Sequence, residues 1–348
     1  MPLAPRPELA GPEPAVHGGL DYAELAELGL RPGDVVDFSV NINPAPLPDE
    51  LRDMLAHADM STYPDSESRR LRQAAANRYG VSPDMVLAGN GSSELIWLAC
   101  MAYLRAGDSV AVRQPTFGEY ARAAQIFCAT IGAFRGPLPE LGNERLAFIC
   151  NPNNPTGGFA PVTDIVKLAR DRPDTLLVVD EAYADFVDGR PTAISADMPH
   201  NLLVLRSLTK FAALAGLRLG LAFAHPQVIA ALSAVKPPWN VNVLAQTAGE
   251  YAMCHPKLLP DIAALARRRT YLQAGLRRIG LAPEPTSCNF FLLPLPHEAA
   301  TVRRQLLAKG VLVRDCASFG LPNHIRICVR PEPDCLRLVE CLASLGLS

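Results

Sequence analysis

The sequence predicts an α/β fold with a mainly parallel sheet in a large domain, followed by a smaller α+β domain. Short apolar segments alternate with helical patterns over the first two thirds of the chain, which is typical of a parallel sheet covered by helices. After Pro237 and Pro238 the pattern changes to a long helix followed by a few strands. The chain has 348 residues, 49% of them hydrophobic, which is enough for more than one compact unit.

The expected elements follow from these patterns in chain order. The strands of the sheet are expected at 85–88, 109–113, 146–150, 176–179, 202–205 and 219–224, with helices at 94–104, 120–128 and 163–170. The second part is expected to contain helices 258–279, 300–309 and 334–345 and strands 290–295, 311–314 and 325–329. We expect a disordered Pro-rich tail at 1–16, an N-terminal segment at 17–48 that packs with the small domain and the active site, a large domain at 49–240 and a small domain at 241–348.

Composition excludes several classes of function. The formal net charge is -2 and no basic stripe is present, so nucleic acid is not an expected partner. No apolar run is long enough to cross a bilayer, so no membrane association is expected. The cysteines form no CxxC pair and no secretion signal precedes them, which predicts reduced thiols and a cytoplasmic protein. The histidines show no metal-ligand spacing, so no metal site is expected.

Lys210 directly follows an expected buried strand and is preceded by the hydroxyls of Ser207 and Thr209. Burial favours the neutral amine that Schiff-base chemistry requires. The two hydroxyls, with Arg218 eight residues later, could bind a phosphate through hydrogen bonds and a bidentate contact. The alternative interpretation is a surface lysine in a polar loop.

Asp180 stands at the end of the next strand towards the N-terminus, followed by Glu181. A carboxylate at the tip of a buried strand is unfavourable unless it is paired. Facing a pyridine nitrogen, it would keep that nitrogen protonated and make the ring an electron sink. The alternative is an ordinary helix cap at a strand end.

Two loops complete the pattern. The string at 151–157, Asn-Pro-Asn-Asn-Pro-Thr-Gly, predicts a rigid turn in which an asparagine could donate to a phenolate oxygen, or else a turn of structural importance alone. The string at 89–94, Gly-Asn-Gly-Ser-Ser-Glu, opens a helix whose N-terminal N–H groups favour an anion, although such turns also commonly cap helices.

Together these strings resemble the fold-type I enzymes that depend on pyridoxal 5′-phosphate (PLP), specifically the histidinol-phosphate aminotransferase-like branch of the class I/II aminotransferase superfamily. The resemblance covers nearly the whole chain from about His17 onwards. It implies an aspartate-aminotransferase-like fold with a seven-stranded sheet, PLP as the cofactor, a small phosphorylated amino acid as the substrate, and a homodimer.

The resemblance also implies a role for each matching residue. Lys210 matches the Schiff-base lysine and Asp180 the partner of the pyridine nitrogen, so these two are the expected catalytic residues. The other expected cofactor contacts are Phe117 stacked on the ring, Asn154 and Tyr183 at the ring hydroxyl, Gly91, Ser92, Ser93, Ser207, Thr209 and Arg218 around the phosphate, and Tyr63, which reaches the phosphate in the neighbouring subunit. The expected substrate contacts are His17, Asn41, Asn154, Arg314 and Arg326.

Several strings are more similar to the threonine-phosphate decarboxylases of cobalamin biosynthesis than to the aminotransferases. They lie at 17–19, 37–44, 117–120, 207–211, 238–242 and 313–316. We therefore expect PLP-dependent decarboxylation of L-threonine O-3-phosphate to (R)-1-aminopropan-2-yl phosphate, with a histidinol-phosphate (or related amino acid) aminotransferase using 2-oxoglutarate as the alternative. Tyr183 and Asn240 depart from the usual decarboxylase residues. The two reactions differ in which Cα bond stands perpendicular to the cofactor ring, which the sequence does not specify.

A different class of function is a PLP-binding regulator. Such proteins resemble this family but carry a helix-turn-helix domain ahead of the fold, and about sixteen residues precede His17 here, so we do not expect one. A degenerate homologue without activity is not expected either, because Lys210, Asp180, Asn154 and Arg218 are all present.

Overall fold

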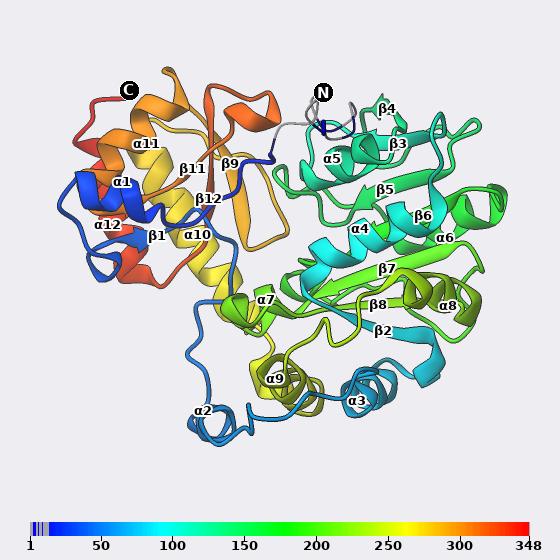
Figure 1. Ribbon diagram of the computed structural model, residues 1–348. Helices are drawn as coiled ribbons and strands as arrows, with labels where there is room; N and C mark the ends of the chain where they lie inside the picture. Colours follow the sequence, from blue (N-terminus) through cyan, green and yellow to red (C-terminus); the bar gives the residue numbers. More distant parts are fainter. Residues whose placement is uncertain (1–2, 5, 7–8, 10–13, 348) are drawn as a thin grey trace.

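The computed structural model describes residues 3–4, 6, 9 and 14–347. Most of the tail expected at 1–16 therefore lies outside the described residues. Figure 1 shows two parts, a large one built around a broad sheet and a smaller one that contains the C-terminus. The helix α7 (Leu208–Phe211) lies where the two parts meet.

The large part contains a seven-stranded sheet with the strand order β2-β8-β7-β6-β5-β3-β4. Its strands are β2 (Val86–Gly89), β3 (Ser109–Arg113), β4 (Thr130–Phe134), β5 (Leu146–Cys150), β6 (Leu176–Asp180), β7 (Leu202–Ser207) and β8 (Gly220–Ala224). The strands from β4 to β7 pair in parallel, whereas β8 is antiparallel to both β7 and β2. The predicted aspartate-aminotransferase-like α/β fold and its seven-stranded, mainly parallel sheet are confirmed.

Six of these strands were expected from the sequence, but β4 was not. It is an edge strand whose residues are mostly exposed or half-buried, and Gly132 interrupts it. An edge strand does not need the continuous apolar run that reveals a buried strand, so the sequence carries little signal for it.

Helices cover both faces of the sheet because the central strands are buried on both sides. Alternate strand residues feed two hydrophobic clusters: Phe148 and Val178 pack in one, Ile149 and Val179 in the other. One face is covered by α4 (Gly91–Tyr103), α5 (Glu119–Ile126) and α8 (Pro226–Val235), and the other by α3 (Arg69–Tyr79), α6 (Val162–Asp171) and α9 (Val243–Cys254). The helices α3 and α9 also pack against each other, and α2 (Asp49–Ala56) packs against α9.

The smaller part contains an antiparallel sheet with the order β11-β12-β9. Its elements are α10 (Ile262–Arg278), β9 (Phe290–Pro294), α11 (Ala299–Leu307), β10 (Val311–Leu312), β11 (Arg314–Asp315), β12 (His324–Cys328) and α12 (Glu332–Ala343). The N-terminal segment joins it, because β1 (Val36–Asp37) pairs in parallel with β10, and Leu25 of α1 (Tyr22–Glu27) packs on Leu307 and Leu312. The domain boundaries at 48 and 240 stay a prediction.

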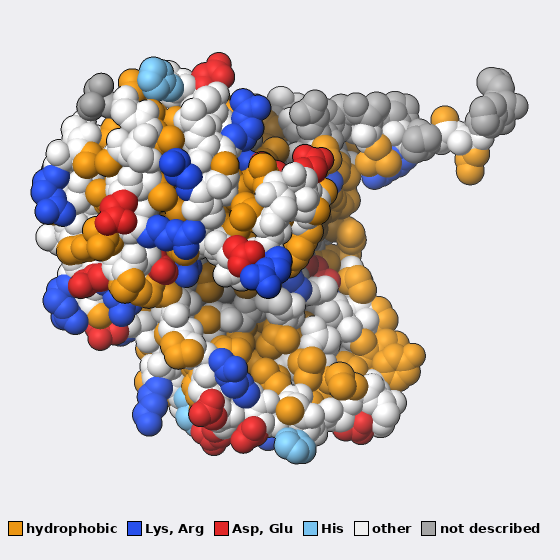
Figure 2. Space-filling model, turned by 90° about the vertical axis from the view of Figure 1, so that its left-hand side faces the viewer, with side chains coloured by type: hydrophobic (Ala, Val, Ile, Leu, Met, Phe, Trp, Pro, Cys, Tyr) orange, Lys and Arg blue, Asp and Glu red, His pale blue; other side chains and the backbone are white. Residues whose placement is uncertain are grey.

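Side-chain types are unevenly spread over one face of the molecule. Figure 2 shows hydrophobic side chains gathered most densely at its lower right, and charged side chains of both signs spread over its upper left and along its lower edge. Among the described residues, none of the helices is long and apolar enough to cross a membrane.

Candidate active site

Most of the predicted cofactor residues line one small cavity at the carboxyl ends of the central strands. The cavity has a volume of about 80 Å³. Its lining is Ser92, Ser93, Phe117, Tyr120, Cys150, Asn154, Asp180, Ala182, Tyr183, Ser207, Thr209, Lys210 and Arg218. Parallel strands place the loops at their carboxyl ends side by side, which is why residues as far apart in sequence as Ser92 and Arg218 converge here.

Lys210 lies in α7, directly after β7. Its pKa is lowered to about 8, first because burial disfavours the charged amine and second because the guanidinium groups of Arg326 and Arg218 lie nearby. Near neutral pH a useful fraction of the amine is therefore neutral. The desolvation inferred from the sequence is present in the structure.

Asp180 is the last residue of β6 and is buried. The hydroxyl of Tyr120 donates to its Oδ2 at 2.8 Å, and the backbone N–H of Ala182 donates to its Oδ1 at 3.0 Å. Burial raises the pKa of the carboxyl, although both hydrogen bonds act in the opposite direction. No lysine or arginine of the described residues forms an ion pair with it, so the site suits a protonated ring nitrogen.

The start of α4 forms an anion cradle with Arg218. Helix α4 offers the N–H groups of Ser92 and Ser93, and its dipole favours negative charge there. A Cβ on Gly220 would stand 2.5 Å from the backbone nitrogen of Ser92, so only glycine permits this approach of strand to helix. A Cβ on Gly91 would stand 3.0 Å from Nη2 of Arg218, which places the guanidinium at the same helix end.

The cradle is completed by hydroxyls from the end of β7. Oγ of Ser207 lies 2.6 Å from Oγ1 of Thr209, and both side chains are buried in the cavity wall. Arg218 donates to the carbonyl of Ala215, and no carboxylate within the described part of the chain pairs with it. Hydroxyls, a guanidinium without a carboxylate partner in the described chain and a helix N-terminus together fit the phosphate of PLP.

A second cavity of about 350 Å³ adjoins the first. The two cavities share Ser93, Phe117, Asn154, Tyr183, Lys210 and Arg218. The second one is also lined by His17, Asn41, Arg314 and Arg326. The structure therefore brings every predicted substrate contact together beside Lys210, and we call this second cavity the anion pocket.

Two buried arginines give the anion pocket its character. Arg314 donates to the carbonyl of Val16 at 2.9 Å and to Oγ of Ser318. Arg326 donates to Oδ1 of Asn154 and to the carbonyl of Ser39. Burial lowers the pKa of Arg314, and the neighbouring Arg326 lowers it further. Over the described residues, neither guanidinium meets a carboxylate.

Asn41 adds an unused polar group to the same pocket. It is 1% exposed, and within the described part of the chain neither its amide nitrogen nor its oxygen has a hydrogen-bond partner. A buried amide without partners is unfavourable, so the geometry fits a ligand that supplies them.

The prediction for Tyr63 is not tested by a single chain. Its side chain is 79% exposed and stacks on Trp239 with 4.6 Å between the ring centroids. It does not line either cavity, and its contact with the cofactor of a neighbouring subunit stays a prediction.

Tyr120 and Cys150 line the cofactor cavity but were not identified from the sequence. Tyr120 is fully buried between Phe117 and Phe148, so in the sequence it resembles an ordinary core aromatic. The sequence carries no local signal for it, because its partner Asp180 lies 60 residues away.

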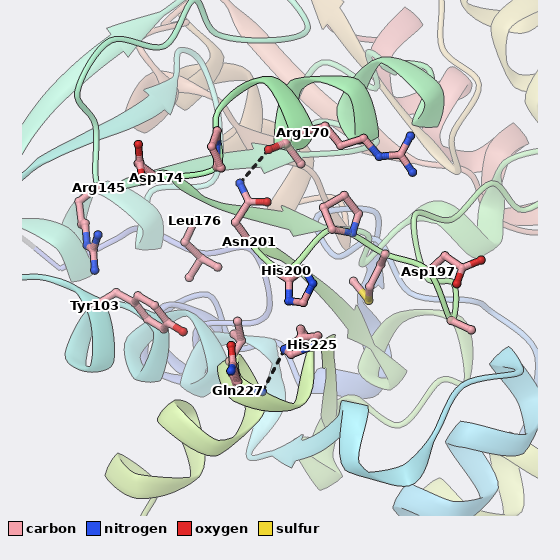
Figure 3. Close-up of a pocket in the computed structure, with 16 residues that line it drawn as sticks. Tyr103, Arg145, Arg170, Asp174, Leu176, Asp197, His200, Asn201, His225 and Gln227 are labelled. Carbon is pink, nitrogen blue, oxygen red and sulfur yellow. Dashed lines mark hydrogen bonds between the residues drawn. The ribbon is translucent and has the colours of Figure 1, made fainter.

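A larger cavity of about 790 Å³ lies at the opposite, amino-terminal edge of the strands (Figure 3). It holds none of the predicted site residues. Its lining contains two arginines, Arg145 and Arg170, and two aspartates, Asp174 and Asp197. The side-chain nitrogen of Asn201 donates hydrogen bonds to the carbonyls of three neighbouring residues, Ala169, Arg172 and Thr175. The charge-balanced lining distinguishes this cavity from the anion pocket.

The sequence profile described as "Aminotransferase class I and II" matches residues 33–342. The chain belongs to this family. It is 38% identical to a histidinol-phosphate aminotransferase of Symbiobacterium thermophilum, covering 92% of each chain. It is 34% identical to the corresponding enzyme of Moorella thermoacetica, covering 87% of this chain and 83% of that protein. The protein is therefore a PLP-dependent enzyme of the aminotransferase superfamily.

Solved structures give the same fold. Histidinol-phosphate aminotransferase from Sinorhizobium meliloti, in complex with PLP, matches with a TM-score of 0.85 and 21% identity, covering 98% of this chain and 96% of that one. L-Threonine-O-3-phosphate decarboxylase from Porphyromonas gingivalis matches with a TM-score of 0.82 and 26% identity, covering 88% of this chain and 98% of that one.

The predicted threonine-phosphate decarboxylase activity is wrong, and so is the link to cobalamin biosynthesis that accompanied it. Relatives that share 34–38% identity over most of this aminotransferase-family chain are named histidinol-phosphate aminotransferases, whereas the decarboxylase appears as a structural neighbour. Five of the six strings that favoured the decarboxylase contribute residues to the anion pocket, and the string at 238–242 does not. An anion pocket binds a phosphate in either reaction and does not by itself decide which Cα bond breaks.

Proposed function

We propose that the protein is an aminotransferase that moves an amino group from a phosphorylated amine, histidinol phosphate or a related amino acid, to 2-oxoglutarate. The choice of reaction is supported by the relatives at 34–38% identity, which are named histidinol-phosphate aminotransferases. The observation that supports an anionic substrate is the pair Arg314 and Arg326, two buried guanidinium groups beside Lys210 with no carboxylate partner in the described chain.

Charge matching supports this choice of substrates. Two buried cations need about two negative charges from whatever binds between them. A phosphate ester carries nearly two negative charges at neutral pH, and 2-oxoglutarate carries one on each carboxylate. Planar guanidinium groups bind two oxygens of either group at once. One pocket can therefore accept the amino donor and the amino acceptor in turn, as transamination requires.

Lys210 and Asp180 have different roles in the proposed reaction. When bound, PLP supplies the electron sink that makes the Cα–H bond of the substrate acidic. Lys210, whose lowered pKa makes its neutral form available, would take the proton from Cα with Nζ and return it to the cofactor carbon on the other side of the substrate nitrogen. Asp180, fixed by Tyr120 and the Ala182 N–H, holds negative charge at the buried end of the cavity.

We further propose that the protein works as a homodimer. Support comes from Tyr63, which stays 79% exposed although its ring packs on Trp239, and from Met60, which is 72% exposed in the same stretch. Large exposed apolar side chains of this kind are typical of contact surfaces.

The function is tested by following amino transfer directly. PLP-loaded protein is incubated with histidinol phosphate and 2-oxoglutarate, and glutamate is measured, with Lys210→Ala as the inactive control. Glutamate formation that depends on both substrates supports the proposal. Absence of glutamate with histidinol phosphate and with a panel of phosphorylated and free amino acids would overturn it, as would CO2 release without amino exchange.

A further inference from the structure

Glu119 is a buried carboxylate that the proposed reaction does not use. It is the first residue of α5, and its side chain is 7% exposed. Its Oε1 lies 3.1 Å from Nε2 of His17 and 3.5 Å from Nη1 of Arg122, and Nε1 of Trp97 donates to Oε2 at 3.4 Å. Burying a carboxylate is unfavourable unless it is paired, so these contacts account for its stability at this position.

The segment that carries His17 is tied down on its other side. The carbonyl of Val16 accepts from Arg314, and the N–H of Gly19 donates to Oγ of Ser39 at 2.8 Å. A Cβ on Gly18 would stand 2.4 Å from the carbonyl oxygen of Ser39, so the chain passes in close contact there. The residues on either side of His17 are therefore fixed near Arg314. The hydrogen bond from His17 to Glu119 then joins this segment to α5 of the large part.

We propose that Glu119 is a positioning residue that holds His17 over the anion pocket, where the imidazolium adds a third donor for the phosphate of the amino donor. With Nε2–H donated to Glu119, Nδ1 is the nitrogen left for a ligand, and it has no hydrogen-bond partner in the part of the chain that the structure describes. In the imidazolium form both ring nitrogens carry a proton, so Nδ1 donates to the phosphate while Nε2 donates to Glu119. The ring of His17 also packs on Phe117 with 5.6 Å between centroids, which restricts its rotation.

The expected consequence is selectivity for phosphorylated donors. Arg314 and Arg326 lie deep in the pocket and serve any dianion, whereas His17 lies at the rim and is 51% exposed. A phosphate has three terminal oxygens and can engage a rim donor while it binds the arginines. An amino donor that lacks a phosphate group places no phosphate oxygen at the rim to accept a hydrogen bond from His17. This inference rests on the proposed function for its choice of substrate, and on the geometry alone for phosphate binding.

A double-mutant cycle tests whether Glu119 acts through His17. The ratio of kcat/KM for histidinol phosphate to that for unphosphorylated histidinol should fall about tenfold in Glu119→Ala, chiefly through KM, as expected for one lost charge-assisted hydrogen bond. Glu119→Ala combined with His17→Ala should lower the ratio no further than His17→Ala alone. Glu119→Gln, which keeps an acceptor oxygen without the charge, should retain part of the selectivity and remains informative if the alanine variant does not fold.

Arg122→Gln is the matched control, because it removes the other cation near Glu119 without touching His17. It should leave the ratio unchanged. Equal losses on both donors in Glu119→Ala, or losses in the double variant that multiply those of the single ones, would show a structural role and overturn the proposal.

A binding measurement separates this proposal from the proposed function. The PLP-loaded protein is titrated with inorganic phosphate, and binding is measured by calorimetry. Phosphate should bind about five- to tenfold more weakly to Glu119→Ala and Glu119→Gln than to the wild type and Arg122→Gln. If no transamination occurs with any phosphorylated amine, the proposed function fails while this titration still decides the role of Glu119. Equal phosphate affinity in all four proteins would contradict the inference.

Discussion

Arg314 and Arg326 are direct cross-strand partners in the antiparallel β11–β12 pair, and each side chain is 5% exposed. Like charges directly opposite each other on a sheet are destabilising, and burial increases the effect. The fold therefore carries an electrostatic cost at this position, which a bound dianion offsets. Functional sites commonly break a local stability rule in this way.

Arg314→Gln should separate binding from stability. We expect kcat/KM for the phosphorylated donor to fall by a factor that corresponds to about 2–3 kcal/mol of transition-state stabilisation, because a charged hydrogen bond to the phosphate is lost. The melting temperature should stay the same or rise, because the repulsion from Arg326 is removed. Steady-state kinetics and thermal unfolding measure both effects.

The control for this prediction is Arg303→Gln. Arg303 is already paired with Glu24 at 2.6 Å, so its loss should not reduce kcat/KM. A marked loss of stability in Arg314→Gln, with unchanged kinetics, would show that Arg314 is a structural residue.

Tyr120→Phe should weaken cofactor binding without unfolding the protein. The phenol is the side-chain donor to Asp180, so its removal should raise the pKa of that carboxyl further and weaken its hold on a protonated ring nitrogen. We expect a loss of about 0.5–1.5 kcal/mol in PLP affinity. Absorbance titration measures it, with Tyr251→Phe, whose hydroxyl donates to Glu50 instead, as the control.

Strand ends were the most informative part of the sequence. Lys210 and Asp180 each follow a buried apolar run, and the run both reveals the strand and predicts the burial that shifts their pKa values. Tyr120 could not be identified in the same way, because its partner lies 60 residues away and a buried tyrosine in a helix resembles core packing. Contacts of this kind depend on the tertiary fold and leave no local pattern.

The choice between reactions was the part that the sequence did not predict correctly. Residues at His17, Asn41 and Arg314 do gather in one pocket, as the strings implied. They specify an anion, however, and not the orientation of the substrate carboxylate. Which bond breaks depends on that orientation. Motifs for binding and motifs for reaction type therefore have to be weighed separately.

Tyr63→Phe tests the predicted dimer. If the hydroxyl reaches the phosphate of the cofactor in the neighbouring subunit, the variant should bind PLP about 0.5–1.5 kcal/mol more weakly and remain dimeric, since the ring can still stack on Trp239. Cofactor titration and sedimentation together measure this. A fully active monomer at assay concentration, or unchanged PLP affinity in a confirmed dimer, would contradict the predicted contact.

Lys210 should leave a pH signature on the stability of the protein freed of PLP. Its pKa is about 8 in the folded chain, against an ordinary value of 10.5. Well below pH 8 the amine is almost wholly charged in both states, and the folded state bears nearly the full cost of burying that charge near Arg326 and Arg218. Between pH 8 and 10.5 the unfolded chain binds more protons than the folded one, so this contribution to stability rises with pH. Above 10.5 the amine is neutral in both states and the cost has disappeared.

Lys210→Met makes that signature measurable. Methionine fills similar space without a charge, so the PLP-free variant should be inactive but more stable than the PLP-free wild type at pH 7. Its advantage in the free energy of unfolding should shrink as the pH is raised from 8 to 10, because the wild-type lysine loses its proton. Urea unfolding at matched ionic strength measures the difference in the free energy of unfolding between the variant and the wild type. The contributions of other titrating groups are common to both proteins and cancel in this difference. A difference that stays constant between pH 7 and pH 10 would mean that Lys210 keeps an ordinary pKa, and the account of how its neutral amine becomes available would have to be abandoned.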